Sequence, residues 1–166
     1  MLDTRGLLVV LNSRAGLLNT RTGMPEVERL ARRALAGAVF AATESEEQAE
    51  SALRDAVRKG LRRVIVAGGD GTAQHAARVL AGSSVELALI PLGSANNIAR
   101  SLGIPLDPRR ALRLAAAGRT RPMDAGLCGD ALFLEAAGIG FHARVLRLYS
   151  RSRTKSLARS IYSLAR

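Results

Sequence analysis

The sequence predicts an α/β protein in which a parallel sheet is covered by helices on both faces, followed by the start of a β-rich second domain. The main observation is alternation. Between residue 6 and about residue 117, short apolar runs alternate with longer segments whose apolar residues recur at helical spacing. The second observation is composition. Apolar residues make up 48% of the 166, mostly Ala, Leu, Val and Ile, with 3 Phe, 2 Tyr and no Trp.

Four short apolar runs predict buried strands, and helical patterns follow each of them. The expected strands are 6–11, 38–42, 64–67 and 87–90. The expected helices are 25–36, 45–59 and 73–80, then short ones near 95–101 and 108–117. A strand and helix order of this kind gives a parallel sheet, and such sheets bind ligands beyond the carboxyl ends of their strands.

The pattern changes after Gly118. Residues 121–127 and 131–137 are expected to form two antiparallel strands joined by a turn at Cys128-Gly129-Asp130. We therefore divide the chain into an α/β domain, 1–120, and the beginning of a second domain, 121–166.

Charge and composition limit the classes of function. The formal net charge of +11 favours an anionic partner. One cysteine excludes an intrachain disulfide, and the sequence shows neither a signal peptide nor an apolar run of membrane-spanning length, so we expect a cytoplasmic protein.

A basic tail follows the last acidic residue, Glu135. It carries Arg144, Arg147, Arg151, Arg153, Lys155, Arg159 and Arg166. Two interpretations stay open: a solvated amphipathic helix, or peripheral contact with the anionic inner face of a membrane. Nucleic acid is not expected as a partner, because no aromatic residues interleave with the arginines.

The glycine loop, Gly68-Gly69-Asp70-Gly71-Thr72, runs from a predicted strand into a predicted helix. Glycines allow a phosphate to approach the backbone closely, and free N–H groups at a helix start attract anions. A carboxylate such as Asp70 repels phosphate, so its presence indicates Mg²⁺ binding or proton transfer from a hydroxyl. The alternative is a glycine-rich turn in which Asp70 only caps the helix.

Two further polar loops lie at predicted strand ends. Asn12–Gly16 combines small residues with a cationic side chain, and Pro91–Arg100 contains a hydroxyl and two amides. Since the carboxyl ends of parallel strands share one edge of the sheet, we expect all three loops to converge there.

These segments resemble the diacylglycerol kinase catalytic domain family, which includes bacterial lipid kinases and sphingosine kinases. Gly68–Thr72 matches its Gly-Gly-Asp-Gly-Thr signature, Pro91–Arg100 resembles its second motif, and Asn12–Gly16 resembles its first loop. Thr43, Asp124 and Gly138–Phe141 also have counterparts in the family.

The resemblance implies an ATP-dependent kinase that phosphorylates a lipid hydroxyl with Mg²⁺, and it implies that Asp70 is the catalytic carboxylate near the γ-phosphate. The implied nucleotide-binding residues are Asn12, Ser13, Arg14, Ala15, Gly16, Thr43, Gly68, Gly69, Asp70, Gly71, Thr72, Gly93, Ser94 and Asn96. The metal ligands stay unknown.

The chain departs from the family pattern at several positions. The loop's Pro and Ser are replaced by Ser13 and Ala15, the second motif has Ser94 and Asn97 for Thr and Asp, and Gln74-His75 stand where Asn-Glu is usual. His142 replaces an Asp, and the rest of the family's second domain does not follow. A NAD-kinase-like enzyme and a non-catalytic nucleotide-binding module therefore remain as alternatives.

Apolar residues at 131–140 lack most of the second domain that they would pack against in the family. We expect them to drive formation of a homo-oligomer or to fold back on the first domain. We also expect residues 1–166 alone to give no lipid kinase turnover. In the family, the second domain forms the surface that holds the acceptor hydroxyl in line with the γ-phosphate, and most of that surface is missing here.

Overall fold

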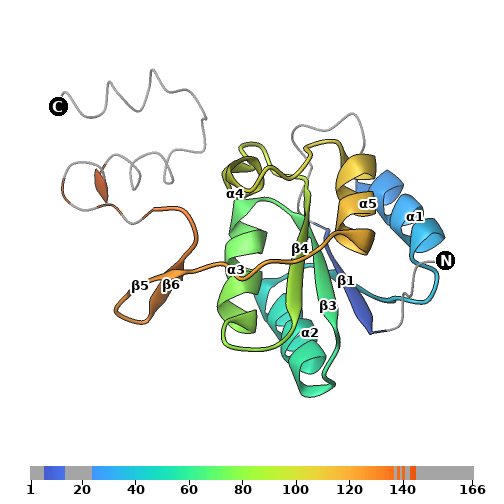
Figure 1. The fold of residues 1–166 in the computed structure, drawn as a ribbon, viewed down its shortest axis with the longest axis horizontal. Helices are drawn as coiled ribbons and strands as arrows, with labels where there is room; N and C mark the ends of the chain where they lie inside the picture. Colours follow the sequence, from blue (N-terminus) through green and yellow to red (C-terminus); the bar gives the residue numbers. More distant parts are fainter. Residues whose placement is uncertain (1–5, 14–23, 137, 139, 141–142, 145–166) are drawn as a thin grey trace. The chain divides into compact units, whose positions relative to one another are not determined.

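A four-stranded parallel sheet forms the centre of the protein (Figure 1). The computed structural model describes residues 6–13, 24–136, 138, 140 and 143–144. The strands lie in the order β2-β1-β3-β4, with bounds β1 Leu7–Asn12, β2 Val39–Thr43, β3 Arg63–Gly68 and β4 Glu86–Pro91. The α/β class and the parallel sheet predicted from the sequence are confirmed.

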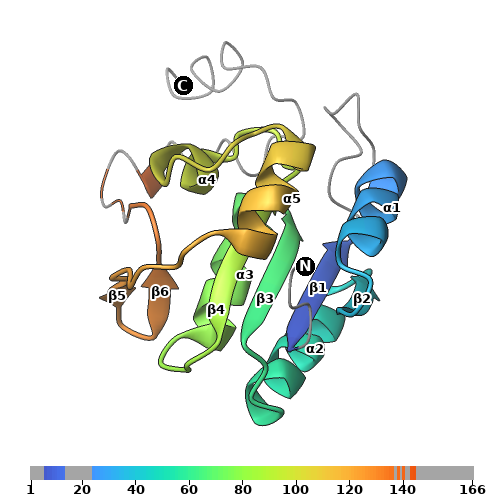
Figure 2. The same ribbon diagram turned by 45° about the vertical axis from the view of Figure 1, so that its right-hand side comes forward.

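Helices cover both faces of the sheet (Figure 2). On one face α1 (Met24–Ala34) and α5 (Pro108–Ala117) pack on Leu7, Val9 and Leu11 of β1. On the other, α2 (Glu46–Arg58) and α3 (Asp70–Leu80) pack on Leu8 and Val10. Side chains of a strand alternate between its two faces, so an uninterrupted apolar β1 serves both layers.

Local sequence sets the helix ends. The Ser45 hydroxyl accepts a hydrogen bond from the Gln48 N–H at the start of α2, and Gly60 follows that helix with a φ of 59°, a conformation that glycine adopts without strain. Asp107 caps α5 in the same way, and Pro108 occupies its first turn, where no N–H is needed.

The strands end level with one another at the edge where the site is expected. Asn12 pairs with Thr43 across β1 and β2, and Gly68 pairs with Pro91 across β3 and β4. The short helix α4 (Asn97–Ser101) follows β4 at this edge. The chain segments that leave the four strands therefore start side by side.

A short hairpin follows α5. Its strands, β5 (Gly126–Cys128) and β6 (Ala131–Phe133), are antiparallel and have three residues each, so the expected strands 121–127 and 131–137 were too long. Residues 121–125 are exposed, and Pro122 has no N–H to give to a ladder. The hairpin lies beside α3 (Figure 1), where Leu134 packs against the apolar cluster of α2 and α3.

The chain divides into two compact units, Met1–Glu135 and Ala136–Arg166. The hairpin thus belongs to the same unit as the sheet. The boundary that we placed after residue 120 stays a prediction. Most of the basic tail lies outside the described residues.

A buried guanidinium holds the opposite edge of the sheet. Arg63, whose side chain is 5% exposed, contacts the Glu86 carboxylate at 2.6 Å. It also donates to the carbonyl oxygens of Ala115 (2.5 Å) and Gly118 (3.0 Å), which end α5. Buried charges are tolerated when they are paired and hydrogen-bonded in this way. Arg63 therefore ties the last turn of α5 to β3 and β4.

We predict that Arg63→Ala lowers the free energy of unfolding by about 3 kcal/mol, since it removes the buried cation from Glu86 and the guanidinium donors from two carbonyl groups. Arg54→Ala, which removes an exposed pair with Glu50, should change it by at most about 0.5 kcal/mol. Urea denaturation of both variants measures the difference. Equal effects would mean that the buried pair adds nothing.

The Arg63–Glu86 pair makes the free energy of unfolding depend on pH. Burial pushes the pKa of Glu86 upward, but hydrogen bonds from Thr120 and Arg63 and the charges of Arg63 and Arg62 leave that pKa below its usual value. Because the pKa of Glu86 is lower in the folded protein than in the unfolded chain, its ionised carboxylate stabilises the fold at any pH above the unfolded-state pKa of roughly 4.3. This stabilisation is lost as the pH falls through the folded-state pKa. The stability gap between wild type and Arg63→Ala should therefore shrink in acid.

Candidate phosphate-binding site

The glycine loop forms the first turn of α3. Gly69 is the N-cap residue of this helix, and no side chain caps it. The helix begins at Asp70, three residues before the apolar stripe from which we predicted it. Backbone N–H groups in a first helical turn have no partner within the helix. The local structure therefore offers N–H groups to an anion at the place that the sequence predicted.

A second turn, at Gly93–Asn96, lies against the glycine loop. Asn96 has a left-handed backbone with a φ of 52°, which Asn tolerates better than most residues. Its side-chain oxygen accepts from the Gly93 N–H at 2.8 Å, and its amide donates to the Gly93 carbonyl at 2.7 Å. Asn96, predicted to bind nucleotide, thus uses its side chain to close its own turn. Ser94 is exposed in the same turn.

The two turns touch through glycines. A Cβ atom placed on Gly93 would lie 2.6 Å from the Cα of Gly69 and 2.8 Å from the Asn96 side-chain oxygen. One placed on Gly69 would lie 3.0 Å from the Cα of Gly93. Side chains at either position would force the loops apart, so these glycines are needed for a backbone-to-backbone contact as well as for any phosphate.

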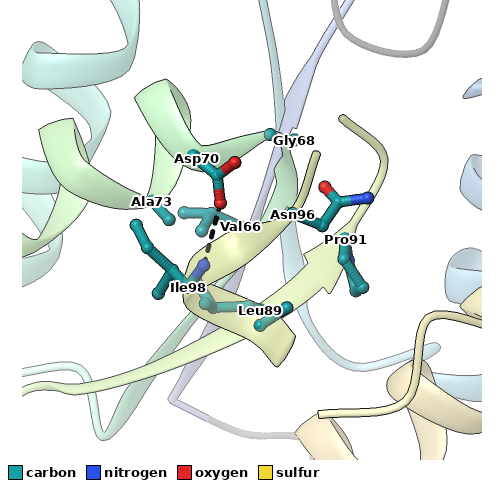
Figure 3. Close-up of a pocket in the computed structure, with 10 residues that line it drawn as sticks. Val66, Gly68, Asp70, Ala73, Leu89, Pro91, Asn96 and Ile98 are labelled. Carbon is teal, nitrogen blue, oxygen red and sulfur yellow. Dashed lines mark hydrogen bonds between the residues drawn. The ribbon is translucent and has the colours of Figure 1, made fainter. Parts of the chain in front are cut away.

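Asp70 connects the glycine loop to α4. Its Oδ1 accepts a hydrogen bond from the Ile98 N–H at 3.0 Å, and its other oxygen points away from that bond (Figure 3). A pocket between α3 and α4 is lined by Gly68, Gly69, Asp70 and Asn96 above apolar side chains from β3 and β4. The suggestion that Asp70 caps a helix is correct in part: it caps α4 and not α3.

The other side of the site comes from β1 and β2. The Asn12 side-chain amide donates to the Thr72 hydroxyl oxygen at 3.0 Å, which joins the end of β1 to the first turn of α3. Buried Thr43 lies next to Asn12, and its carbonyl accepts from the Ser13 N–H at 3.0 Å. Arg14, Ala15 and Gly16 lie outside the described residues.

The structure thus brings most of the predicted residues to one edge. Asn12, Ser13, Thr43, Gly68–Thr72 and the 93–96 turn all lie at the carboxyl ends of the strands (Figure 2). Asp124 is exposed in the segment before the hairpin. Among the described residues, no group of three or more His, Cys, Asp or Glu could hold a metal ion.

Sequence reasoning missed two residues at this edge, Gln74 and Glu135. The Gln74 amide holds β6 against α3 through the backbone of Leu132 and Leu134. Glu135 is exposed, and partial loss of hydration together with the negative charge of Asp70 raises its pKa above the usual value. Two signals for Gln74 were in the sequence: it stands where the family usually has Asn, and it follows Asp70 by four residues on one helical face.

We predict that Gly93→Ala destabilises the fold by about 2 kcal/mol, because the added methyl group overpacks the contact with Gly69. Gly71→Ala, where a Cβ would meet nothing within 4 Å, should keep or raise the stability, since Ala favours a helix. Thermal unfolding of the two variants provides the comparison. A neutral Gly93→Ala would show that the turns are not in contact.

Comparison with known proteins agrees with this geometry. The diacylglycerol kinase catalytic domain matches residues 6–128. A protein named "Probable lipid kinase YegS-like" from Pseudomonas putida is 38% identical over 116 residues, which cover 69% of this chain and 39% of the relative. A protein of the same name from Pseudomonas aeruginosa is 36% identical over 160 residues, which cover 95% of this chain and 51% of the relative.

A crystal structure of a diacylglycerol kinase from Bacillus anthracis has a TM-score of 0.66 and 26% identity to this chain, covering 77% of it and 47% of the crystallised chain. The chain spans about half the length of these proteins, or less. The match over 6–128, the shared fold and the arrangement of the strand-end loops lead to one conclusion: the chain belongs to the diacylglycerol kinase catalytic domain family.

Proposed function

We propose that this chain is the nucleotide-binding part of an ATP-dependent lipid kinase. The observation that carries the proposal is the glycine loop at the start of α3, joined to Gly93 on one side and to Asn12 on the other. The relatives named as lipid kinases support a lipid acceptor.

The proposed reaction transfers the γ-phosphoryl group of ATP. The acceptor hydroxyl oxygen bonds to the γ-phosphorus, the bond from that phosphorus to the bridging oxygen breaks, and ADP leaves. The N–H groups of the glycine loop and the Thr72 hydroxyl hold the phosphates, and Mg²⁺ arrives with the triphosphate, whose oxygens are ligands that it prefers. Asp70 is the proposed catalytic residue, with its oxygen that does not bond Ile98 taking the acceptor's proton.

The Ile98 contact changes how Asp70 is tested. Asp70→Ala would remove the cap of α4 as well as the charge, so loss of activity would have two causes. Asp70→Asn keeps an oxygen for the Ile98 N–H and removes the charge. It is therefore the variant that separates chemistry from structure.

We predict that Thr72→Val weakens MgATP binding about tenfold, because a hydrogen bond to a charged phosphate is lost. Thr72→Ser should bind as wild type does. Thr120→Val removes a hydroxyl at the opposite edge of the sheet, where it contacts Glu86, and serves as the matched control. Isothermal titration calorimetry measures all four proteins. Absence of MgATP binding to the wild type at millimolar concentration would refute the proposed function.

The acceptor is tested with labelled ATP and a fusion of this chain to the second domain of one of the relatives, because no turnover is expected from residues 1–166 alone. Transfer to a diacylglycerol dispersion supports the lipid kinase, transfer to NAD supports the NAD-kinase-like alternative, and tight MgATP binding without transfer to either supports a nucleotide-binding module. The same assay tests the expectation that residues 1–166 alone give no turnover.

Membrane contact through the basic tail is a further part of the proposal. No helix within the described ranges has the length and the apolar run that crossing a bilayer requires. Vesicles with anionic lipid should bind the chain and neutral vesicles should not, and the binding should fall steeply with salt. Replacing Arg151, Arg153 and Lys155 with Ser should weaken it. Flotation assays measure each case, and equal binding to both vesicle types would contradict the proposal.

Self-association stays a prediction. In this structure Leu134 packs on the α2 and α3 side of its own chain, as the fold-back expectation requires. Sedimentation equilibrium decides whether residues 131–140 also bind a second copy.

A further inference from the structure

The two helix layers that cover the sheet differ in charge. Helices α1 and α5, called here the α1–α5 layer, carry six arginines and two glutamates between them, a formal charge of +4. Helices α2 and α3, on the other face, carry five acidic residues and three arginines, a formal charge of −2. The fold therefore separates charge across the sheet, with the excess of arginine on one layer.

Much of the positive charge on the α1–α5 layer has no acidic partner. Both glutamates of the layer are already paired with arginines, Glu26 with two of them and Glu28 with one. Among the described residues, three further arginines of the layer are exposed and their guanidinium groups engage neither a carboxylate nor another acceptor: Arg33, Arg110 and Arg113. These three cations are therefore open to an external anion.

Apolar side chains lie among these arginines. Leu114 is 44% exposed, and it follows Arg110 by four residues and Arg113 by one, so it belongs to the same outer face of α5. Leu106, just before α5, is 36% exposed. Helices that lie on a bilayer combine such residues, because the apolar side chain enters the boundary below the headgroups while the cations stay at the phosphates.

A nucleic acid is the other common partner of an arginine-rich face. Proteins that bind single strands stack bases on exposed aromatic side chains. The sequences of α1 and α5 contain no aromatic residue, and Phe40 of the neighbouring β2 is partly buried, with the Arg32 guanidinium 4.5 Å from its ring. Arginines mixed with exposed leucines therefore favour a lipid surface over a nucleic acid.

The α1–α5 layer adjoins the edge that holds the glycine loop. Helix α5 follows α4 at that edge and runs to the opposite edge, where Arg63 binds its last turn. A contact of 3.1 Å between Glu26 and Arg109 joins the first turns of α1 and α5, which lie side by side (Figure 1). A bilayer against this layer would therefore lie alongside the proposed phosphate-binding site.

We infer that the α1–α5 layer is a docking surface for an anionic lipid bilayer. Arg33, Arg110 and Arg113 bind lipid phosphates there, and Leu114 enters the boundary between the headgroups and the acyl chains. This inference rests on the proposed function, because a kinase with a lipid acceptor must meet its substrate at a bilayer. It differs from contact through the basic tail, since it assigns the contact to the folded α/β part of the chain.

The test measures binding of residues 1–166 to phosphatidylcholine vesicles with and without phosphatidylglycerol, with the tail unchanged in every protein. A layer variant combines Arg33→Gln, Arg110→Gln and Arg113→Gln. It should bind anionic vesicles at least about tenfold more weakly than wild type, because each arginine near the headgroups strengthens binding roughly fivefold. Its binding should also depend less steeply on salt.

A matched control removes the same charge from the other side of the sheet. It combines Arg54→Gln, Arg58→Gln and Lys59→Gln, which are exposed positions in α2 and directly after it. This control variant should weaken vesicle binding by less than about twofold, because its positions face away from the docked bilayer. Gln suits a helix about as well as Arg does, so both variants keep the fold.

Leu114→Gln tests the apolar part of the contact. It should lower the affinity for anionic vesicles about threefold, because the exposed part of the leucine no longer leaves water on binding. It removes no charge, so the salt dependence should stay that of the wild type. An unchanged affinity would show that no side chain enters the bilayer at this position.

Four results would overturn the inference. One is equal weakening in the layer and control variants, which would mean that only net charge matters, and another is wild-type binding by the layer variant, which would leave the contact to the tail. The others are equal binding of wild type to neutral and anionic vesicles, and tighter binding of an RNA oligonucleotide that the layer variant loses.

Calorimetry with MgATP separates this inference from the proposed function. The layer variant should bind MgATP as wild type does, because its substitutions lie outside the strand-end loops. Absence of MgATP binding by the wild type refutes the proposed function, whereas the comparison of the layer and control variants on vesicles decides the docking surface by itself.

Discussion

Gly69 and Gly93 lie so close together that a Cβ atom on Gly93 would clash with Gly69 and one on Gly69 would press on Gly93, and the geometry of the whole edge depends on this contact. It joins the turn after β3 to the turn after β4. The Gly69–Gly93 contact positions the first turn of α3 and the left-handed Asn96 that closes the second turn. It also positions the Asp70 carboxylate that accepts from the Ile98 N–H. Parallel strands place their ends side by side, but only small residues allow the loops to meet.

Much of this fold could be predicted from the sequence, because the signals were local. Apolar runs marked β1 and β3, and Pro108 after Asp107 marked the start of α5. The convergence of the glycine loop with Asn12 followed from the parallel direction of the strands, and Thr43 was placed there by the family resemblance. Local patterns also explain the weaker predictions: the second hairpin strand was predicted too long because its apolar residues continue past Phe133, whereas the Leu134 N–H bonds the Gln74 side chain.

The remaining features depend on pairs of residues far apart in the chain. Gln74 meets residues 132 and 134, and Arg63 meets Glu86 and the end of α5. Gln74 departs from the family pattern and lies one helical turn after Asp70, but neither observation points to the hairpin as its partner. The role of Asn96 was also hidden, since a side chain that closes its own turn and one that binds a ligand look the same in a sequence.

The bond between Asp70 and the Ile98 N–H has a consequence for the entropy of binding. A carboxylate on an unrestrained side chain samples several rotamers, and a ligand that needs one of them must order it on arrival. Here the Ile98 N–H of α4 already fixes the orientation of the Asp70 carboxylate in the free protein. Under the proposed function, the site is therefore preorganised at its catalytic carboxylate, and the free energy of ligand binding is not spent on arranging that group.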